Sequence, residues 1–191
     1  MNDADLPTWT HDLAQLFNAS WGVLLPQTVS ARVDARLANL ATIGADGAPE
    51  ARGVVLRAAD PARCTLDIFT DATTRKCDEI AADPRAALTL WREDVLLQLR
   101  LRGTIAIIEG PMAQDAWAGL SDSALPDYGV TPKPGTPINA PDAYTRSPDA
   151  ARFAILRMTV DTMDVVSLNR PTHTRAFYER RDGWRGQWQA P

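Results

Sequence analysis

Residues 96–108 alternate between apolar and polar side chains in the pattern of a β-strand. The alternating residues are Leu97, Gln98, Leu99, Arg100, Leu101 and Arg102. Successive side chains of a strand point to opposite faces, so this segment has one apolar face and one strongly polar face. An antiparallel sheet that curls into a barrel buries the first face and leaves the second in water. The segment therefore predicts a barrel strand.

Further short β-type runs precede and follow this segment. They cover 36–43, 51–59, 65–70, 86–92, 153–160, 162–168 and 174–180. Asp46-Gly47 and Asp60-Pro61 separate the first three runs and are turn signals. The sequence therefore predicts a mainly β (α+β) fold with six to eight antiparallel strands. At 191 residues, the chain is expected to form a single domain, 1–191.

Helical periodicity is confined to three places. Residues 10–25 predict an amphipathic helix that starts at the cap Thr10, within an N-terminal helical cover over 1–30. A second helix follows Thr73-Thr74 and ends at Asp83-Pro84, with Ile80 and Ala81 expected to face inward.

The third helix is expected near 111–120 and leads into a Pro-rich segment, 121–150. Six prolines and two glycines in that segment argue against regular structure there. Because long loops inside compact domains are usually functional or disordered, 121–150 is a candidate lid or interface arm.

Charge and composition exclude several classes of function. The formal net charge is −4 and the pI is about 5.1, which argues against nucleic-acid binding. The acidic N-terminus is no secretory signal, and no apolar run approaches the ~20 residues of a membrane helix, so we expect a cytoplasmic protein. Two cysteines and two histidines are too few for a metal site of the usual kind, and none is expected.

Arg75 and Lys76 place two cations in the first turn of the second helix. The helix dipole makes that end electropositive, which disfavours cations by about 0.3–1 kcal/mol each at exposed sites. A phosphate bound by the helix amides, the Thr hydroxyls and both cations would reverse this penalty. The alternative is neutralisation by nearby carboxylates, namely those of Asp71, Asp78 and Glu79.

Several segments, taken in order, resemble the pyridoxamine 5′-phosphate oxidase family of FMN-binding split barrels. They are RGVVLR at 52–57, IFT at 68–70, TTRK at 73–76, DPRAALTLW at 83–91, QLRLRG at 98–103 and HTRAFYERRDGW at 173–184. The resemblance implies a split β-barrel with FMN as the cofactor, bound at the interface of a homodimer and contacted by both chains.

The resemblance also implies roles for individual residues. Arg52 would lie near the FMN phosphate, with the backbone of Val54–Leu56 beside the isoalloxazine. The implied cofactor-binding residues are Arg52, Gly53, Val54, Val55, Leu56, Arg57, Phe69, Thr70, Thr74, Arg75, Lys76, Gln98 and Arg175. The implied substrate-binding residues are Arg57, His173 and Lys133. No catalytic acid or base is assigned, which suits direct hydride transfer to flavin.

Departures from the family pattern concern both the substrate and the flavin, and one of them is a residue inserted between Arg170 and His173. Arg57 replaces a substrate-contacting lysine, and Val166 replaces a flavin-contacting tryptophan. The segment 121–137 offers no aligned phosphate-binding arginine, and Lys133 is the only cation that could substitute there. The resemblance therefore predicts an FMN-dependent oxidoreductase acting on a small substrate, with pyridoxamine or pyridoxine 5′-phosphate as one candidate.

Two alternatives remain open on the same barrel. One is a non-catalytic module that binds flavin or haem, and the other is a reductase that uses a nicotinamide or deazaflavin donor. The sequence names neither the substrate nor the electron acceptor.

Overall fold

A computed structural model describes residues 8–25 and 37–191. Residues 1–7 and 26–30 of the expected N-terminal cover, and Arg36 of the first expected strand, lie outside the described residues. The helices are α1 (Leu13–Leu24), α2 (Arg75–Ala82) and α3 (Pro111–Ala118). The strands are β1 (Leu37–Ile43), β2 (Pro49–Asp60), β3 (Thr65–Asp71), β4 (Arg85–Arg92), β5 (Leu97–Ile108), β6 (Val130–Thr131), β7 (Thr145–Arg146), β8 (Phe153–Ser167), β9 (Thr174–Glu179) and β10 (Gln187–Gln189).

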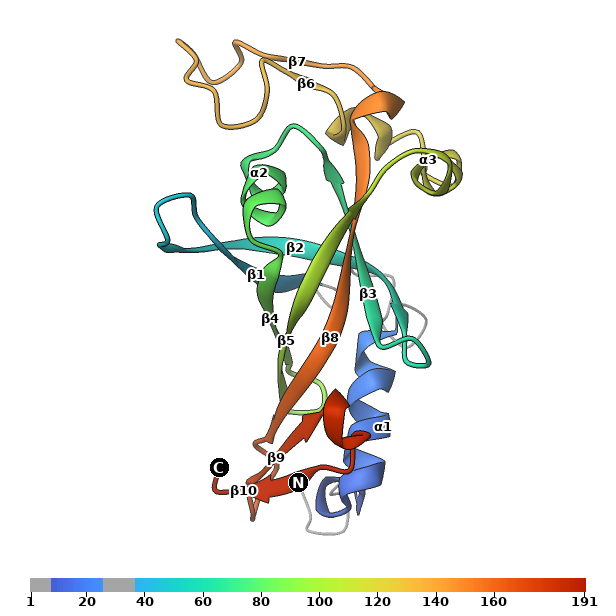
Figure 1. Ribbon diagram of the computed structural model, residues 1–191, viewed down its shortest axis with the longest axis vertical. Coiled ribbons are helices and arrows are strands. Elements are labelled where there is room, and N and C mark those ends of the chain that lie inside the picture. The colour runs from blue at the N-terminus through green and yellow to red at the C-terminus, as the bar shows by residue number, and fades with distance from the viewer. Residues whose placement is uncertain (1–7, 26–36) are drawn as a thin grey trace.

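Six of these strands close into an antiparallel barrel (Figure 1). The order is β8-β3-β2-β1-β4-β5, and β5 returns to pair with β8. β9 and β10 extend the sheet beyond β8, and β6 pairs only with β7. The fold is therefore the expected mainly antiparallel barrel with flanking helices.

The barrel interior is built from the alternation that the sequence shows. Leu97, Leu99 and Leu101 of β5 are fully buried, whereas Arg100 and Arg102 are exposed. Helix α1 packs along the lower part of the barrel (Figure 1), where Leu16, Trp21 and Leu24 join the same core. Apolar burial of this kind is the main favourable term in folding.

A second, smaller core lies between α3 and the first residues of β8. Tyr128 and Phe153 are buried there with their ring centroids 4.9 Å apart. Trp117 of α3 contacts both rings, at 6.0 Å from Tyr128 and 5.5 Å from Phe153. This cluster fixes α3 and the start of the Pro-rich segment onto the barrel.

Four local expectations were wrong. Asp12, not Thr10, caps α1, because its Oδ1 accepts from the Gln15 backbone N–H at 2.8 Å. Ala81 is exposed, and Cys77 is the inward neighbour of Ile80. The two runs 153–160 and 162–168 form one 15-residue strand, β8.

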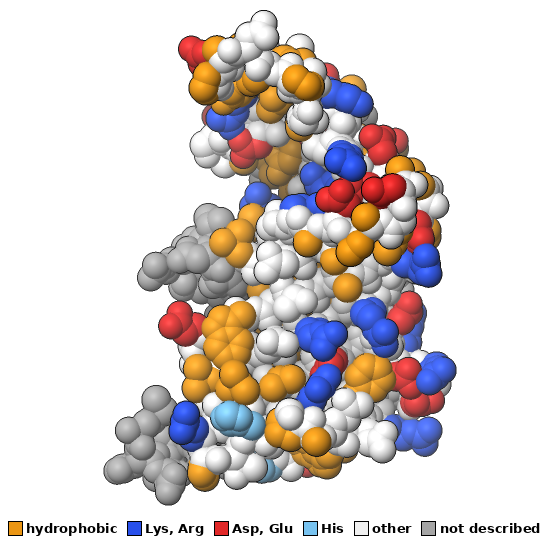
Figure 2. Space-filling view, turned by 90° about the vertical axis from the view of Figure 1, so that its left-hand side faces the viewer, with side chains coloured by type: hydrophobic (Ala, Val, Ile, Leu, Met, Phe, Trp, Pro, Cys, Tyr) orange, Lys and Arg blue, Asp and Glu red, His pale blue; other side chains and the backbone are white. Residues whose placement is uncertain are grey.

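The fourth concerns residues 121–150, which are not wholly irregular because β6 pairs with β7 there. We call 121–150 the Pro-rich arm, and it projects from the end of the barrel that carries α2 (Figure 1). In the space-filling view a recess lies beneath the arm, with basic side chains at its rim (Figure 2). None of the described helices is long and apolar enough to cross a membrane.

Candidate functional site

The barrel is open between β2 and β3, beside α2. β2 pairs with β1 over residues 49–55 but with β3 only from Leu56 to Asp60. The register shifts at Arg57, and β3 after Ile68 pairs only with β8. Among the described strands, the facing edges of β2 before Leu56 and β3 after Ile68 therefore have no partner. Such edges present free backbone N–H and C=O groups to a ligand.

This opening brings together most of the residues that the sequence assigns to the cofactor. Val54 and Leu56 are buried in the core, so only their backbone is available at the edge. Gly53 is exposed and Val55 is half-buried. Thr70 is buried at the end of β3, with its Oγ1 3.3 Å from the Thr74 Oγ1.

Three cations surround the first turns of α2, and we call Arg52, Arg75 and Lys76 the cationic cup. Arg52 of β2 donates to the Oε2 of Glu79 at 2.7 Å and to the Oγ1 of Thr42. Glu79 lies one helical turn after Arg75 and is buried, with only 3% of its side chain exposed. Arg52 is thus held in place by groups from β1 and α2.

Arg75 lies at the rim of the cup. Its side chain is 72% exposed and pairs with Glu50 at 3.3 Å and with Glu79 at 3.5 Å. Glu79 therefore neutralises Arg75, which is the alternative to phosphate binding that the sequence left open. Exposed ion pairs of this length contribute little to stability.

Lys76 differs from Arg75 because no described ion pair neutralises it. Its Nζ donates to the Thr74 Oγ1 at 3.0 Å, and no described carboxylate lies within ion-pair distance of it. Burial, as the largest cause, lowers the pKa of Lys76 below its ordinary value of 10.5. A half-buried ammonium without a direct counter-ion is electrostatically costly and suits an anionic ligand.

The loop that leads into α2 is held by Asp71. The buried Asp71 accepts from the Thr73 backbone N–H at 2.8 Å and from the Thr73 hydroxyl at 2.7 Å. Arg152, at the base of the Pro-rich arm, pairs with Asp71 at 2.6 Å and donates to the Thr73 Oγ1 at 2.8 Å. Asp71 therefore orders the loop that leads into the cup, and none of the described ion pairs joins it to Arg75 or Lys76.

Arg57, at the bulge of β2, faces the smaller aromatic core. Its Cζ lies 5.9 Å from the centre of the Phe69 ring, within cation–π range. Phe69 packs edge-on against Phe153 with 5.2 Å between their centroids. Burial raises the pKa of Tyr128, and the nearby Arg57 opposes that rise. The cation of Arg57 therefore lies beside an aromatic surface.

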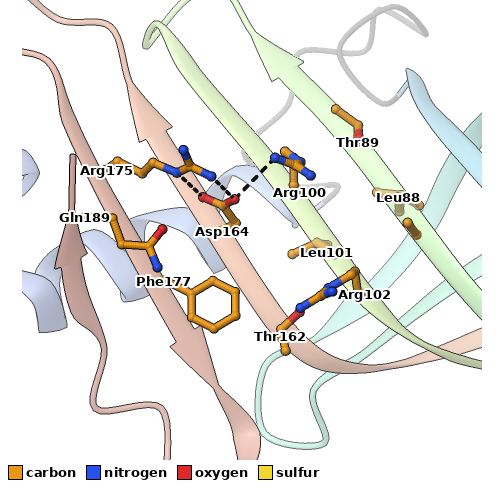
Figure 3. Close-up of a pocket in the computed structure, with 11 residues that line it drawn as sticks. Leu88, Thr89, Arg100, Leu101, Arg102, Thr162, Asp164, Arg175, Phe177 and Gln189 are labelled. Atoms are coloured by element: carbon orange, nitrogen blue, oxygen red, sulfur yellow. Dashed lines mark hydrogen bonds and ion pairs between the residues drawn. The ribbon is translucent and has the colours of Figure 1, made fainter. Parts of the chain in front are cut away.

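Gln98 and Arg175 lie elsewhere, on the outer face of the sheet. Gln98 of β5 lies opposite Val166 of β8, which lies opposite Arg175 of β9. The guanidinium of Arg175 pairs with Asp164 through bonds of 3.0 and 2.8 Å (Figure 3). Asp164 raises the pKa of Arg175, chiefly through these hydrogen bonds.

A pocket of about 310 Å³ lies beside this pair on the outer face. Arg100 approaches Asp164 from the other side at 3.5 Å, and Arg102 donates to the Thr162 Oγ1 at 3.2 Å (Figure 3). Arg52, by contrast, lies on the same face of β2 as Val54 and Leu56, which is the face toward the barrel interior. Within the described residues no hydrogen bond or ion pair connects the cationic cup with Gln98 or Arg175.

His173 and Lys133, the other two expected substrate residues, are both exposed. Lys133 lies in the Pro-rich arm and His173 in the connection between β8 and β9. Neither contacts Arg57 in the described part of this chain. One copy of the chain therefore does not bring the three expected substrate residues together.

Sequence reasoning missed the roles of Glu79, Arg152 and Tyr128. The spacing of Arg75 and Glu79 is a signal for a helical ion pair, but not for the burial of Glu79 or its bond to Arg52. Arg152 and Asp71 are 81 residues apart, and no local pattern connects them. No described cluster of His, Cys, Asp and Glu side chains could hold a metal ion.

Comparison with known proteins agrees with this geometry. The family model described as "Pyridoxamine 5′-phosphate oxidase, FMN-binding domain" matches residues 18–109, which include the cup and the opening. A pyridoxine/pyridoxamine 5′-phosphate oxidase of Microcystis aeruginosa is 28% identical over 178 residues, 85% of this chain and 82% of that protein. The corresponding oxidase 2 of Arabidopsis thaliana is 27% identical over 154 residues, 73% of this chain and 76% of that protein.

Solved structures show the same fold. A pyridoxamine 5′-phosphate oxidase-related, FMN-binding protein from Nostoc punctiforme is 25% identical, with a TM-score of 0.74 over 98% of this chain and 100% of that chain. PhzG from Burkholderia lata, solved with tetrahydrophenazine-1-carboxylic acid, is 20% identical, with a TM-score of 0.68 over 98% of this chain and 95% of that chain. Residues 18–109 therefore form the FMN-binding domain of the pyridoxamine 5′-phosphate oxidase-like split barrels, and the cofactor of this domain is FMN.

Proposed function

We propose that this protein is an FMN-dependent oxidoreductase that acts on a small anionic substrate. The observation that carries the proposal is the opening between β2 and β3, which ends at the cationic cup. A flavin ring has polar edges for the free strand edges, and its phosphate suits Arg52, Arg75, Lys76 and the Thr74 hydroxyl. The residues present therefore fit FMN.

Bound FMN supplies the redox chemistry by accepting a hydride equivalent from the substrate. The chain's own residues bind the cofactor and the substrate and orient them. The cationic cup holds the phosphate end of the cofactor, and the unpaired edge of β2 fixes the other end. Arg57 attracts an anionic group of the substrate, while Phe69 provides an aromatic surface beside that cation.

Pyridoxine 5′-phosphate is the substrate to test first, because relatives that cover most of the chain are named as oxidases of this compound. We expect the purified protein to show a flavin spectrum and to release peroxide when it oxidises the substrate in air. A Soret band in place of the flavin spectrum would identify a haem-binding module. A colourless protein that fails to bind added FMN would contradict the proposal.

The electron donor separates oxidase from reductase. Under anaerobic conditions we expect pyridoxine 5′-phosphate to bleach the bound flavin at a rate that exceeds bleaching by NADH or NADPH. Faster bleaching by a nicotinamide would indicate a reductase on the same barrel. FMN that no donor reduces would indicate a cofactor-binding module without turnover.

We further propose that the complete site forms in a homodimer. Arg52 points toward the inside of the barrel at the cup, whereas Arg175 and Gln98 lie on the outer face of the same chain. A two-fold arrangement would bring the outer face of one copy to the opening of the other. Trp91 of β4, which is 45% exposed and lies beside Gln98 of β5, would be covered in such an arrangement.

Subunit complementation tests this arrangement. Arg52→Ala and Arg175→Ala proteins are each expected to bind FMN poorly. When the two variants are unfolded together and refolded, each mixed dimer would contain one unaltered site and one site that lacks both arginines. FMN should therefore bind to half of the sites in the mixed dimers. If the mixture binds no more FMN than either variant alone, both residues act on the same chain.

A further inference from the structure

Glu79 is a carboxylate buried within the cationic cup, where phosphate binding gives no obvious use for a negative charge. Its side chain is 3% exposed and lies on the face of α2 that meets β1 and β2. Its Oε2 accepts from the Thr42 hydroxyl at 2.5 Å and from Arg52 at 2.7 Å. Its Oε1 is buried without a hydrogen bond, and the Arg75 Nε lies 3.5 Å from it.

The contacts of Arg52 show what this carboxylate does. An arginine side chain has many rotamers, and its ordering is part of what anion binding costs. In this structure one terminal nitrogen of Arg52 donates to Thr42 and the other to Glu79, so the guanidinium plane is fixed without a ligand. Five N–H donors are available on a guanidinium, and these two described bonds leave three for phosphate oxygens.

Arg75 and Lys76 are close enough to be affected by the same group. Arg75 is paired with Glu79 along one helical turn. Burial is the largest effect on the pKa of Lys76 and lowers it. Glu79 opposes this effect together with Cys77 and Asp71, whose contributions are larger. A single carboxylate therefore touches or influences each cation of the cup. Without it, three cations would repel one another around a half-buried space.

We propose that Glu79 is a positioning residue for the cofactor phosphate, acting through Arg52. It does not touch the phosphate itself. It holds the guanidinium of Arg52 in the orientation that the anion needs, so that less conformational entropy is lost when the phosphate binds. This inference rests on the proposed cofactor site. Its competitor is a purely structural role, in which Glu79 only fastens α2 to β1 through Thr42.

A double-mutant cycle on FMN affinity distinguishes the two roles. Apoprotein is prepared for wild type, Glu79→Ala, Arg52→Ala and the double variant, and FMN dissociation constants are taken from the quenching of flavin fluorescence. We expect Glu79→Ala to weaken FMN binding about tenfold, the scale of one charge-assisted hydrogen bond. The double variant should bind FMN no more weakly than Arg52→Ala alone, because Glu79 then has nothing to position.

Riboflavin, which lacks the phosphate, is the second probe. Its dissociation constant should be the same in wild type and Glu79→Ala, because Arg52 contacts only the phosphate end. Equal losses for FMN and riboflavin, additive losses in the double variant, or unchanged FMN affinity would each overturn the proposal. Circular dichroism of each apoprotein verifies the fold. If Glu79→Ala does not fold, Glu79→Gln, which keeps an acceptor oxygen but not the charge, replaces it in the cycle.

Asp78→Asn is the matched control. Asp78 lies next to Glu79 on α2 but is exposed, and none of the described ion pairs includes it. We expect its FMN affinity to equal that of wild type within twofold. Wild-type protein that fails to bind FMN would contradict the proposed function itself, whereas wild-type binding with an unaffected Glu79→Ala would contradict only the role of Glu79.

Discussion

Arg152 and Asp71 form an ion pair of 2.6 Å between segments that lie 81 residues apart in the chain. Asp71 begins the loop of the cationic cup, and Arg152 ends the connection from the Pro-rich arm to β8. The backbone joins the same segments, because the Ala72 N–H donates to the Arg152 carbonyl at 2.6 Å. The base of the Pro-rich arm and the loop of the cationic cup are therefore held together by side-chain and backbone bonds.

Removing one partner of this pair should destabilise the protein. Arg152→Ala leaves the Asp71 carboxylate buried without its cation, which typically costs about 3–5 kcal/mol. We expect the urea midpoint of unfolding to fall and FMN binding to weaken, because the Thr73 loop loses its support. Replacing both partners, as Asp71→Asn with Arg152→Met, should recover much of the stability. Unchanged stability in Arg152→Ala would show that the pair is solvated in solution.

Arg75→Ala with Lys76→Ala should abolish FMN retention while the fold remains. Arg75 lies at the rim of the cup and Lys76 is half-buried, but neither side chain belongs to the barrel core. Absorbance of the purified protein measures FMN content, and circular dichroism measures the fold. Arg63→Ala, which removes an exposed arginine paired with Asp60 away from the opening, is the control and should keep its FMN. Stoichiometric FMN in the double variant would refute the role of the two cations.

Lys76→Met should stabilise the apoprotein while weakening FMN binding. Burial lowers the pKa of Lys76, so the folded state holds the lysine proton less tightly than the unfolded state does. At neutral pH the charged lysine therefore reduces apoprotein stability, and an apolar side chain of similar length removes this effect. Thermal unfolding with and without FMN measures both effects. A lower melting temperature for the apo variant would contradict the assignment.

The same lowered pKa predicts how FMN affinity changes with pH. Lys76 favours phosphate only while protonated, and it loses its proton below the ordinary lysine value of 10.5. FMN affinity should therefore decrease as the pH rises through the alkaline range beneath that value. Lys76→Arg keeps its charge throughout and should bind FMN with little change over the same range. Parallel pH profiles in the two proteins would exclude Lys76 as the titrating group.

The barrel was predictable because its signals are local. Alternation in 96–102 defines the inward face of β5, and Asp46-Gly47 forms the expected turn, with Gly47 at a φ of +80°. The cationic cup was also predictable in part, since Arg75 and Lys76 conflict with the helix dipole.

The remaining features depend on contacts across the fold. β8 was read as two strands because Asp161 is exposed in its middle, where the register with β5 also shifts. From the sequence, Glu79 was considered only as one of three carboxylates that could neutralise Arg75 and Lys76, and glutamate is rarely fully buried unless it is paired. Packing of α2 against β1 and β5 turns it inward. Tyr128 lies within the Pro-rich arm, whose composition hides its place in an aromatic core.

The unpaired edges of β2 and β3 connect the folding of this protein to its cofactor. Any molecule that bonds to those edges only in the native state adds RT ln(1 + [L]/Kd) to the free energy of unfolding. On the proposed site, FMN would occupy the edges that a further strand would otherwise cover, and it would stabilise the fold as well as supply the redox chemistry. The amount of folded protein that survives proteolysis should consequently rise and fall with the supply of flavin. Riboflavin starvation would then lower the amount of the protein as well as its activity.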